Sequence, residues 1–213
     1  MSTESDLQGD TGLIMNKSTK TDPIFAELQK SIDCVTRLKN DSEIVECISD
    51  IADVLESALL NGNKILLAGN GGSAADAQHL AGEFVSRFNY DRPGLAAFAL
   101  TTDTSVLTAI GNDYGYERVF SRQVEAVGSK KDIFIGISTS GTSMNILNAL
   151  EAAKNNGLVT VGFCGSYRDG FEANCDYIFS APSDSTPKIQ EMHIIVGHIV
   201  CGLVESCIFP RKD

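Results

Sequence analysis

Apolar positions along the chain follow two different patterns, and the change between them falls at Gly62. Before this glycine, apolar residues recur at helical spacing, at Phe25, Leu28, Ile32, Val35 and Leu38. The pattern predicts a helix from about Pro23, and a similar pattern predicts a second helix over Asp41–Leu60. The second helix is expected to end at Asn61-Gly62, because glycine favours helix C-termini.

Beyond Gly62, short apolar runs of strand length alternate with helical patterns. The predicted strands are Ile65–Ala68, Ala96–Leu100, Ile133–Ile137, Val159–Cys164 and Tyr177–Ser180. The predicted helices are Ser73–Arg87, Ser105–Ile110, Val119–Ala126, Ser143–Asn155 and Pro187–Cys207. Continuous apolar strands separated by helices indicate a parallel sheet with both faces covered. We therefore expect one α/β domain over residues 22–213, a three-layer αβα sandwich on a five-stranded parallel sheet with an N-terminal helical hairpin.

Residues 1–21 show no periodicity and are rich in Ser, Thr and Asp, which is typical of a disordered leader. They lack the basic and apolar regions of a signal peptide. The most apolar stretch, near Ile194–Phe209, is interrupted by polar residues and glycine before it reaches the ~18 apolar residues typical of a membrane span. The six cysteines form no C-x-x-C pair and are expected to be reduced. These features favour a cytoplasmic protein.

The chain has 17 Lys and Arg against 28 Asp and Glu, which gives a formal net charge of −11. This balance argues against nucleic acids and anionic membranes as partners, because both require a positive surface. It leaves small anionic ligands open, since backbone N–H groups can hold an anion without lysine or arginine.

Two predicted strands end in sequences suited to such a ligand. The first runs into Asn70-Gly71-Gly72-Ser73, where the glycines allow a tight turn and Ser73 is a good N-cap. The third runs into Ser138-Thr139-Ser140-Gly141-Thr142-Ser143, whose hydroxyls precede a helix and can hold a phosphate. Ordinary helix-entry turns are the alternative at both places. Neither spacing fits a dinucleotide-binding motif or a P-loop.

The three histidines lie on predicted helices. His79 and Glu83 are four residues apart and share a helix face, so they can share a metal or place a base beside an acid. On the last helix, either Gln190 or Glu191 can act with His198, and helix geometry alone does not choose between them. His193 points about 140° away from His198. A partly exposed His–Glu pair and core histidines are the alternatives.

Together these stretches resemble the sugar isomerase (SIS) domain family, and within it the phosphoheptose isomerases. The resemblance is carried by GNGGSAADAQHLAGEFVSRF, RPG, IGNDYGYERVFSRQVEAVG, GISTSGTSMNILNA and IQEMHIIVGH, which run in this order from about residue 69 to 198. It implies a flavodoxin-like sheet and a homotetramer with active sites at subunit interfaces. It also implies conversion of D-sedoheptulose 7-phosphate to D-glycero-D-manno-heptose 7-phosphate, the first step toward nucleotide-activated heptose for lipopolysaccharide or capsule.

The resemblance further implies roles for individual residues. Phosphate binding falls to Ser73, Ser138, Thr139, Ser140 and Ser143. The sugar would be lined by Asn70, Gly71, Gly72, Asn112 and Asp113, together with Glu83 and Gln190. One zinc ion per subunit would be bound by His79, Glu83, Gln190 and His198. Glu83 and His198 match the family's acid–base pair, and a ketose–aldose conversion through an enediol requires such a pair.

Two alternatives belong to other functional classes. A close relative with the same fold binds the bacterial replication initiator DnaA without catalysis, and it lacks the second histidine of the last helix. This chain has His198 together with His79 and Glu83, which favours the isomerase. A phosphosugar-sensing regulator usually carries a DNA-binding module, and this sequence has no apparent helix-turn-helix segment.

Overall fold

The computed structural model of the protein describes residues 18–211. Within this range, five parallel strands form a sheet in the order β2-β1-β3-β4-β5. The strands are β1 Ile65–Gly69, β2 Ala97–Ala99, β3 Ile133–Ile137, β4 Val159–Cys164 and β5 Tyr177–Ser180. The prediction of a five-stranded parallel sheet is confirmed, and β3, β4 and β5 have the predicted bounds.

The strand order places a topological switch between β1 and β3. From β1 the chain moves to β2 on one side and then forms β3 on the other side. Gly69 and Ile137, the last residues of β1 and β3, are paired in the register. The loops that follow therefore start side by side at Asn70 and Ser138. Ligands of open parallel sheets bind at such a switch point.

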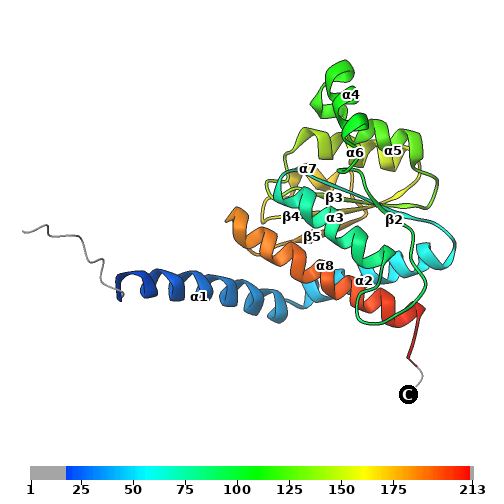
Figure 1. Cartoon of the computed structure of the whole chain (residues 1–213). Helices are drawn as coiled ribbons and strands as arrows, with labels where there is room; N and C mark the ends of the chain where they lie inside the picture. The colour runs from blue at the N-terminus through cyan, green and yellow to red at the C-terminus, as the bar shows by residue number, and fades with distance from the viewer. Residues whose placement is uncertain (1–17, 212–213) are drawn as a thin grey trace, which may run out of the picture.

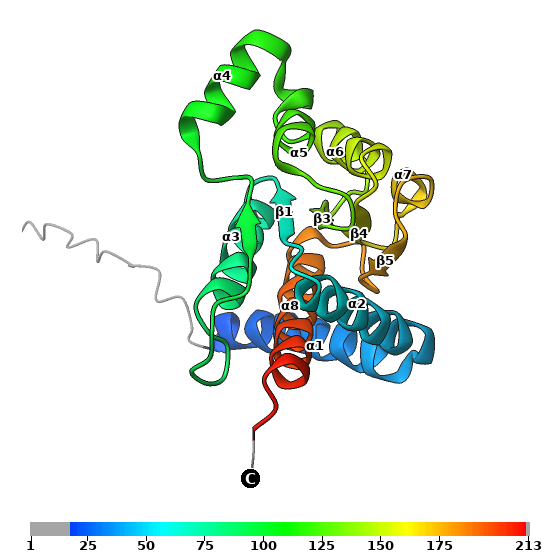
Figure 2. The same cartoon turned by 90° about the vertical axis from the view of Figure 1, so that its right-hand side faces the viewer.

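Helices cover both faces of the sheet (Figures 1 and 2). One face carries α1 Ser18–Asn40, α2 Ser42–Leu60, α3 Gly72–Val85 and α8 Thr186–Ile208. The other carries α5 Ser121–Val127, preceded by the 3-10 turn η1 Tyr116–Arg118, and then α6 Met144–Asn155 and α7 Asp169–Glu172. Along β1, Ile65 and Leu67 face the first core, and Leu66 and Ala68 face the second. The αβα sandwich is thus confirmed, and two apolar faces explain the continuous apolar strands.

Two helices project from this body. In Figure 1, α1 extends from the sandwich as a long rod. The helix α4, Thr104–Tyr114, rises beyond α5 and α6 on the side of the sheet opposite α8 in both views (Figures 1 and 2). Within residues 18–211, α4 has no buried residue. On α1, the large apolar side chains of Phe25, Leu28 and Ile32 are exposed.

Two helix starts differ from the prediction. The helix α1 begins at Ser18 and contains Pro23, so residues 18–21 are helical although they were predicted to end the leader. Residues 1–17 of the predicted leader lie outside the described residues. The helix α3 begins at Gly72 with Gly71 as its N-cap, so the prediction of Ser73 as N-cap is wrong. Gly71 has a φ of +56°, which glycine adopts without steric strain, and the helix can therefore start earlier.

The helix α8 is the one helix among residues 18–211 that is long and apolar enough, by length and composition, to cross a membrane. Its apolar residues are nevertheless part of the core shared with α2 and α3, at Met192, Val196, Val200 and Val204. It also carries the buried charged residues Lys188 and Glu205. These contacts identify α8 as the central core helix of its face of the sheet.

Candidate active site

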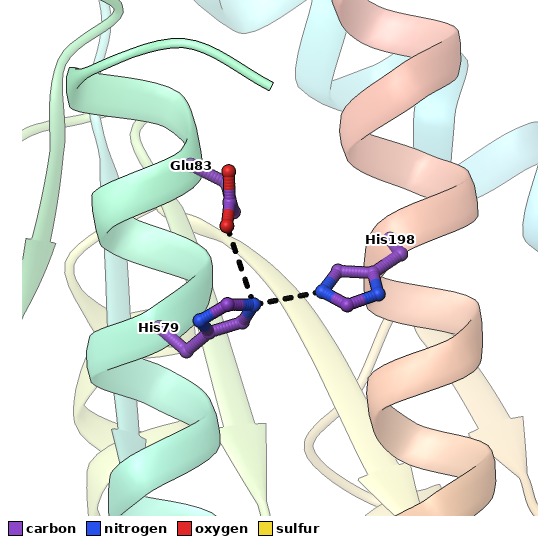
Figure 3. Close-up of side chains that lie close together, drawn as sticks. All are labelled: His79, Glu83 and His198. Atoms are coloured by element: carbon purple, nitrogen blue, oxygen red, sulfur yellow. Dashed lines mark hydrogen bonds and ion pairs between the residues drawn. The ribbon is translucent and has the colours of Figure 1, made fainter. Parts of the chain in front are cut away.

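Three side chains from two helices converge on one face of the sandwich (Figure 3). His79 and Glu83 lie about one turn apart on α3, and His198 reaches them from α8. The Nε2 atoms of His79 and His198 are 2.7 Å apart, and His79 Nε2 lies 3.3 Å from a carboxylate oxygen of Glu83. Donor atoms of all three residues lie within 4.8 Å of one another. Imidazole nitrogens and carboxylate oxygens bind zinc and other divalent ions, so this cluster can hold a metal.

A close approach of α3 and α8 presents these side chains to each other. Leu80 of α3 is buried, and a Cβ on Gly197 of α8 would lie only 2.6 Å from the Leu80 side chain. The two helices can therefore touch here because residue 197 is glycine. His79 and His198 are the sequence neighbours of these two contact residues. The helix contact thus brings the two imidazoles together, while the His79 side chain keeps 47% of its surface exposed.

A pair of side-chain amides joins the loops at the topological switch. Asn70, after β1, and Asn145, at the start of α6, exchange two hydrogen bonds of 2.9 Å. The hydroxyl of Tyr116 donates to Asn70 Oδ1 at 3.3 Å. Ser73, the second residue of α3, is only 3% exposed. The sequence pattern pointed to Asn70 and missed Asn145, because no local signal connects residues 75 positions apart.

The hydroxyl groups after β3 form a cluster. Ser138 Oγ donates to Ser143 Oγ at 3.0 Å, and Thr142 Oγ1 donates to Ser140 Oγ at 3.0 Å. Ser143 is the N-cap residue of α6, and among the described residues its side chain makes no capping hydrogen bond. Thr139 lies in the same loop and is half-buried. Hydroxyls rotate to suit their partners, so this loop and the adjoining helix start can accommodate an anion.

The glycine turn after β1 contacts Gln190 of α8. A Cβ on Gly72 would lie 2.5 Å from Gln190 Nε2, so glycine at this position lets the amide reach the backbone. Glu191 instead accepts hydrogen bonds from Ser31 at 2.7 Å and from Lys188 at 2.8 Å. These bonds lower the pKa of Glu191 and direct its carboxylate toward α1. Of the two candidates on α8, it is Gln190 that lies beside the predicted ligand loop.

His193 belongs to the core. Its Nε2 atom lies 3.0 Å from the carbonyl oxygen of Cys164 at the end of β4, and its ring contacts Phe163 and Phe179. Burial lowers the pKa of His193 to about 4, so its imidazole is neutral near pH 7. The core-histidine alternative therefore holds for His193, whereas His79 and His198 meet in the cluster.

Asp76 is a candidate site residue that the sequence pattern missed. It precedes His79 by three residues on α3, a spacing that makes two helical side chains neighbours. Its Oδ2 atom is buried and has no hydrogen-bond partner within residues 18–211. Burial raises the pKa of this carboxyl, and His79 partly offsets the effect. The spacing was available as a signal, but helical aspartates are usually exposed.

Two predicted residues stand apart from the cluster. Asn112 and Asp113 are exposed on α4, where Asn112 Nδ2 donates to Asp113 Oδ1 at 2.8 Å. Figures 1 and 2 place α4 on the opposite side of the sheet from α8. Within one chain, the structure therefore does not bring these two side chains to His79, Glu83 and His198.

Known proteins are similar to this chain in sequence and fold over most of their length. The model of the SIS domain matches residues 29–165, which include β1 to β4 and both predicted ligand loops. A phosphoheptose isomerase of Aneurinibacillus thermoaerophilus is 56% identical over 191 residues, covering 90% of this chain and 96% of that protein.

Two solved structures have the same fold at lower identity. A phosphoheptose isomerase from Neisseria gonorrhoeae has a TM-score of 0.82 and 40% identity, covering 87% of this chain and 98% of its own. A phosphoheptose isomerase from Francisella tularensis has a TM-score of 0.84 and 34% identity, and the match covers 88% of this chain and 98% of that chain. With the parallel sheet, its switch point and the family match, these findings show that the chain belongs to the SIS domain family.

Proposed function

We propose that the chain is a phosphoheptose isomerase, which converts D-sedoheptulose 7-phosphate to D-glycero-D-manno-heptose 7-phosphate on the way to nucleotide-activated heptose. The observation that carries the proposal is the cluster of His79, Glu83 and His198 on α3 and α8, with α3 starting from one of the two loops at the switch point. Near full-length similarity to proteins named phosphoheptose isomerase supports the same activity.

The proposed reaction moves a proton from C1 to C2 of the sugar through an enediol, which requires a base and a second proton donor. Glu83 removes the proton from C1 and returns a proton to C2. His198 delivers a proton to O2 and accepts one from O1, so the protons balance over the cycle. Donor atoms of the two side chains lie within 4.8 Å, close enough to act on neighbouring atoms of one substrate.

In this proposal the substrate phosphate is held at the switch point by neutral donors and a helix start. The hydroxyl donors are Ser73, Ser138, Thr139, Ser140 and Ser143. The sugar chain is lined by Asn70, Gly71, Gly72, Asn112, Asp113 and Gln190. Because none of these groups is a cation, a net charge of −11 is compatible with a phosphorylated substrate.

The donor set of the cluster fits zinc, with His79, Glu83 and His198 as ligands and Gln190 as the fourth. When bound, zinc supplies polarisation of the substrate carbonyl or orientation of the side chains around it. A carboxylate held tightly by a metal is a poor base. Glu83 can therefore remove the C1 proton only where its contact with the metal is loose, or where the metal has a structural role.

We further propose a homotetramer in which neighbouring copies complete each site. The apolar residues exposed on α1 follow a spacing of three and four residues, at Phe25, Leu28, Ile32 and Val35. Such a stripe on a projecting helix is suited to a second copy. The six free cysteines and the acidic composition support a cytoplasmic enzyme without a nucleic-acid partner.

A coupled assay on D-sedoheptulose 7-phosphate tests this function. We expect turnover by the purified enzyme, loss of turnover on chelation, and recovery when zinc is added back. Glu83→Gln should lower kcat by about 10²–10⁴ without unfolding the protein. Absence of turnover in the presence of zinc would contradict the isomerase, and tight binding of the replication initiator DnaA in its place would favour the non-catalytic alternative. Activity that survives complete chelation would contradict the metal assignment.

A further inference from the structure

A buried ion pair lies between the C-terminal ends of α3 and α8. Arg92 Nε is 3.1 Å from Glu205 Oε1, and the two side chains are 2% and 1% exposed. Charges at such depth are tolerated only where close partners compensate for the lost hydration. Burial raises the pKa of Glu205, but hydrogen bonds from Phe88, Asn89 and Arg92 outweigh this effect and leave the pKa below the ordinary 4.5. The pair is therefore charged and fixed in geometry.

This ion pair clamps the segment that follows α3. The Glu205 carboxylate accepts the backbone N–H of Phe88 at 2.8 Å and that of Asn89 at 2.7 Å. The Arg92 guanidinium donates to the carbonyl oxygens of Glu83 at 2.8 Å and Phe84 at 2.6 Å. These carbonyls belong to the last turn of α3, where a helix leaves its acceptors without partners. Arg92 thus caps the C-terminus of α3, and its ion pair with Glu205 links this cap to α8.

Both residues of the ion pair are linked by contacts to the proposed acid–base pair, Glu205 to His198 through Phe88 and Arg92 to Glu83. Glu205 follows His198 by seven residues, which places it about two turns further along α8 and on nearly the same face. The ring of Phe88 packs against the imidazole of His198, with centroids 5.5 Å apart and an interplanar angle of 38°. The same carboxylate that holds the Phe88 backbone therefore also fixes the ring beside His198. On the other side, Arg92 bonds the backbone of Glu83 itself.

We propose that Arg92 and Glu205 are positioning residues of the reaction, which set the Glu83 backbone and, through Phe88, the His198 ring in the geometry that proton transfer requires. The inference rests on the proposed isomerase function. It differs from a purely stabilising role, in which loss of the ion pair would lower stability and leave turnover per folded molecule unchanged.

Asp132 provides a matched control elsewhere in the fold. Its side chain is 2% exposed, it accepts the backbone N–H of Lys64 at 3.0 Å and of Ser129 at 2.8 Å, and it pairs with the Lys64 ammonium. It therefore shares with Glu205 two backbone donors and one cation, and it also accepts a hydrogen bond from the Asn63 side-chain amide at 3.3 Å. It lies just before β3, at the amino ends of β1 and β3, whereas the ligand loops follow the carboxyl ends.

The experiment compares Glu205→Gln and Asp132→Asn in the full chain, at a temperature where both variants are fully folded by circular dichroism. We expect both to lower Tm. Glu205→Gln should lower kcat about tenfold or more with KM within about twofold, because small displacements of reacting groups are costly. Asp132→Asn should leave kcat within about twofold. Arg92→Lys keeps the charge, and should recover part of the kcat that Arg92→Met loses.

Equal kcat for Glu205→Gln and Asp132→Asn would overturn the positioning role. If Glu205→Gln does not fold, Phe88→Leu tests the same link, because it removes the ring beside His198 and keeps the ion pair. Phe88→Leu should then lower kcat, and an unchanged kcat would overturn the inference. The imidazole NMR signals of His198 give a readout independent of turnover: they should shift in Glu205→Gln and not in Asp132→Asn. If wild-type protein turns over no sedoheptulose 7-phosphate while this shift is present, the proposed function fails and the positioning of His198 stands.

Discussion

The packed helices α3 and α8 and the exposed helix α4 carry different parts of the predicted site. On α3 and α8, the contact of Leu80 with Gly197 fixes the backbone, and the His–Glu–His cluster is formed within one chain. On α4, Asn112 donates to its neighbour Asp113, and within residues 18–211 the helix has no buried residue. A side chain gains a fixed position from the packing of its helix. We therefore expect the acid–base half of the site to be preformed, and the α4 half to be positioned by another surface.

Among the variants considered, loss of His198 is expected to change kcat most, because His198 belongs to the preformed acid–base half of the site. His198→Ala should lower kcat by about 10²–10⁴, because it removes a proposed proton donor, and should weaken zinc binding because it removes a ligand. The coupled assay and calorimetric titration with zinc measure the two effects. Glu191→Gln on the same helix is the control, since its carboxylate contacts Ser31 and Lys188, and it should change kcat by no more than about twofold. Unaltered zinc affinity in His198→Ala would show that the metal binds elsewhere.

Local spacing explains which parts of this half could be predicted from the sequence. The four-residue interval places His79 and Glu83 on one helix face, and continuous apolar runs give β3, β4 and β5 their bounds. No local rule pairs His79 with a residue 119 positions away, and that link came from the resemblance to a family. The N-cap of α3 was missed because a positive φ at Gly71 replaced the expected serine cap. The spacing of apolar residues predicts a helix in the region of α4, but it does not predict that this helix contains no buried residue.

A charge introduced on the exposed face of α1 tests whether a second copy of the chain is required to position the α4 half of the site. Ile32 is 56% exposed in the single chain, so Ile32→Glu should cost little there, but an unpaired charge in an interface is strongly unfavourable. We expect smaller species in analytical ultracentrifugation, a kcat lowered about tenfold or more, and a zinc affinity within about twofold of wild type. Lys30→Glu, at a 62%-exposed side chain on the same helix, is the control for added charge. A dissociated variant with full activity would show that one chain suffices.

The pH dependence of the free energy of unfolding tests the burial of the His193 imidazole, which packs α8 against the core. Burial keeps the pKa of His193 at about 4, below the ordinary 6.5, so the unfolded chain binds a proton that the folded chain does not. Wild-type stability should therefore fall from pH 7 to pH 5, by roughly 2 kcal/mol from this residue. His193→Gln can still donate to the Cys164 carbonyl but does not titrate, so its stability should depend less on pH. Denaturant unfolding at both pH values measures the difference, and equal slopes would contradict the lowered pKa.

The smallest effect is expected on α4. Tyr114 is 53% exposed, and the Arg122 guanidinium carbon lies 4.2 Å from the centroid of its ring. An exposed cation–π contact contributes about 0.5–1 kcal/mol, so Tyr114→Ala should lower the free energy of unfolding of a dissociated single chain by that amount. Leu80→Ala in the α3–α8 contact should cost about 2–5 kcal/mol by the same denaturant measurement.

Repeating Tyr114→Ala in the dissociated Ile32→Glu background sharpens the comparison between the two halves. A loss that is large in wild-type protein and small in the dissociated background would mean that a second copy covers α4, since removal of that copy restores the exposure seen in the single chain. A loss as large as that of Leu80→Ala in the dissociated background would contradict the exposure of Tyr114 in the single chain. In that case Asn112 and Asp113 would be fixed within one chain, and the site would need no second copy to position them.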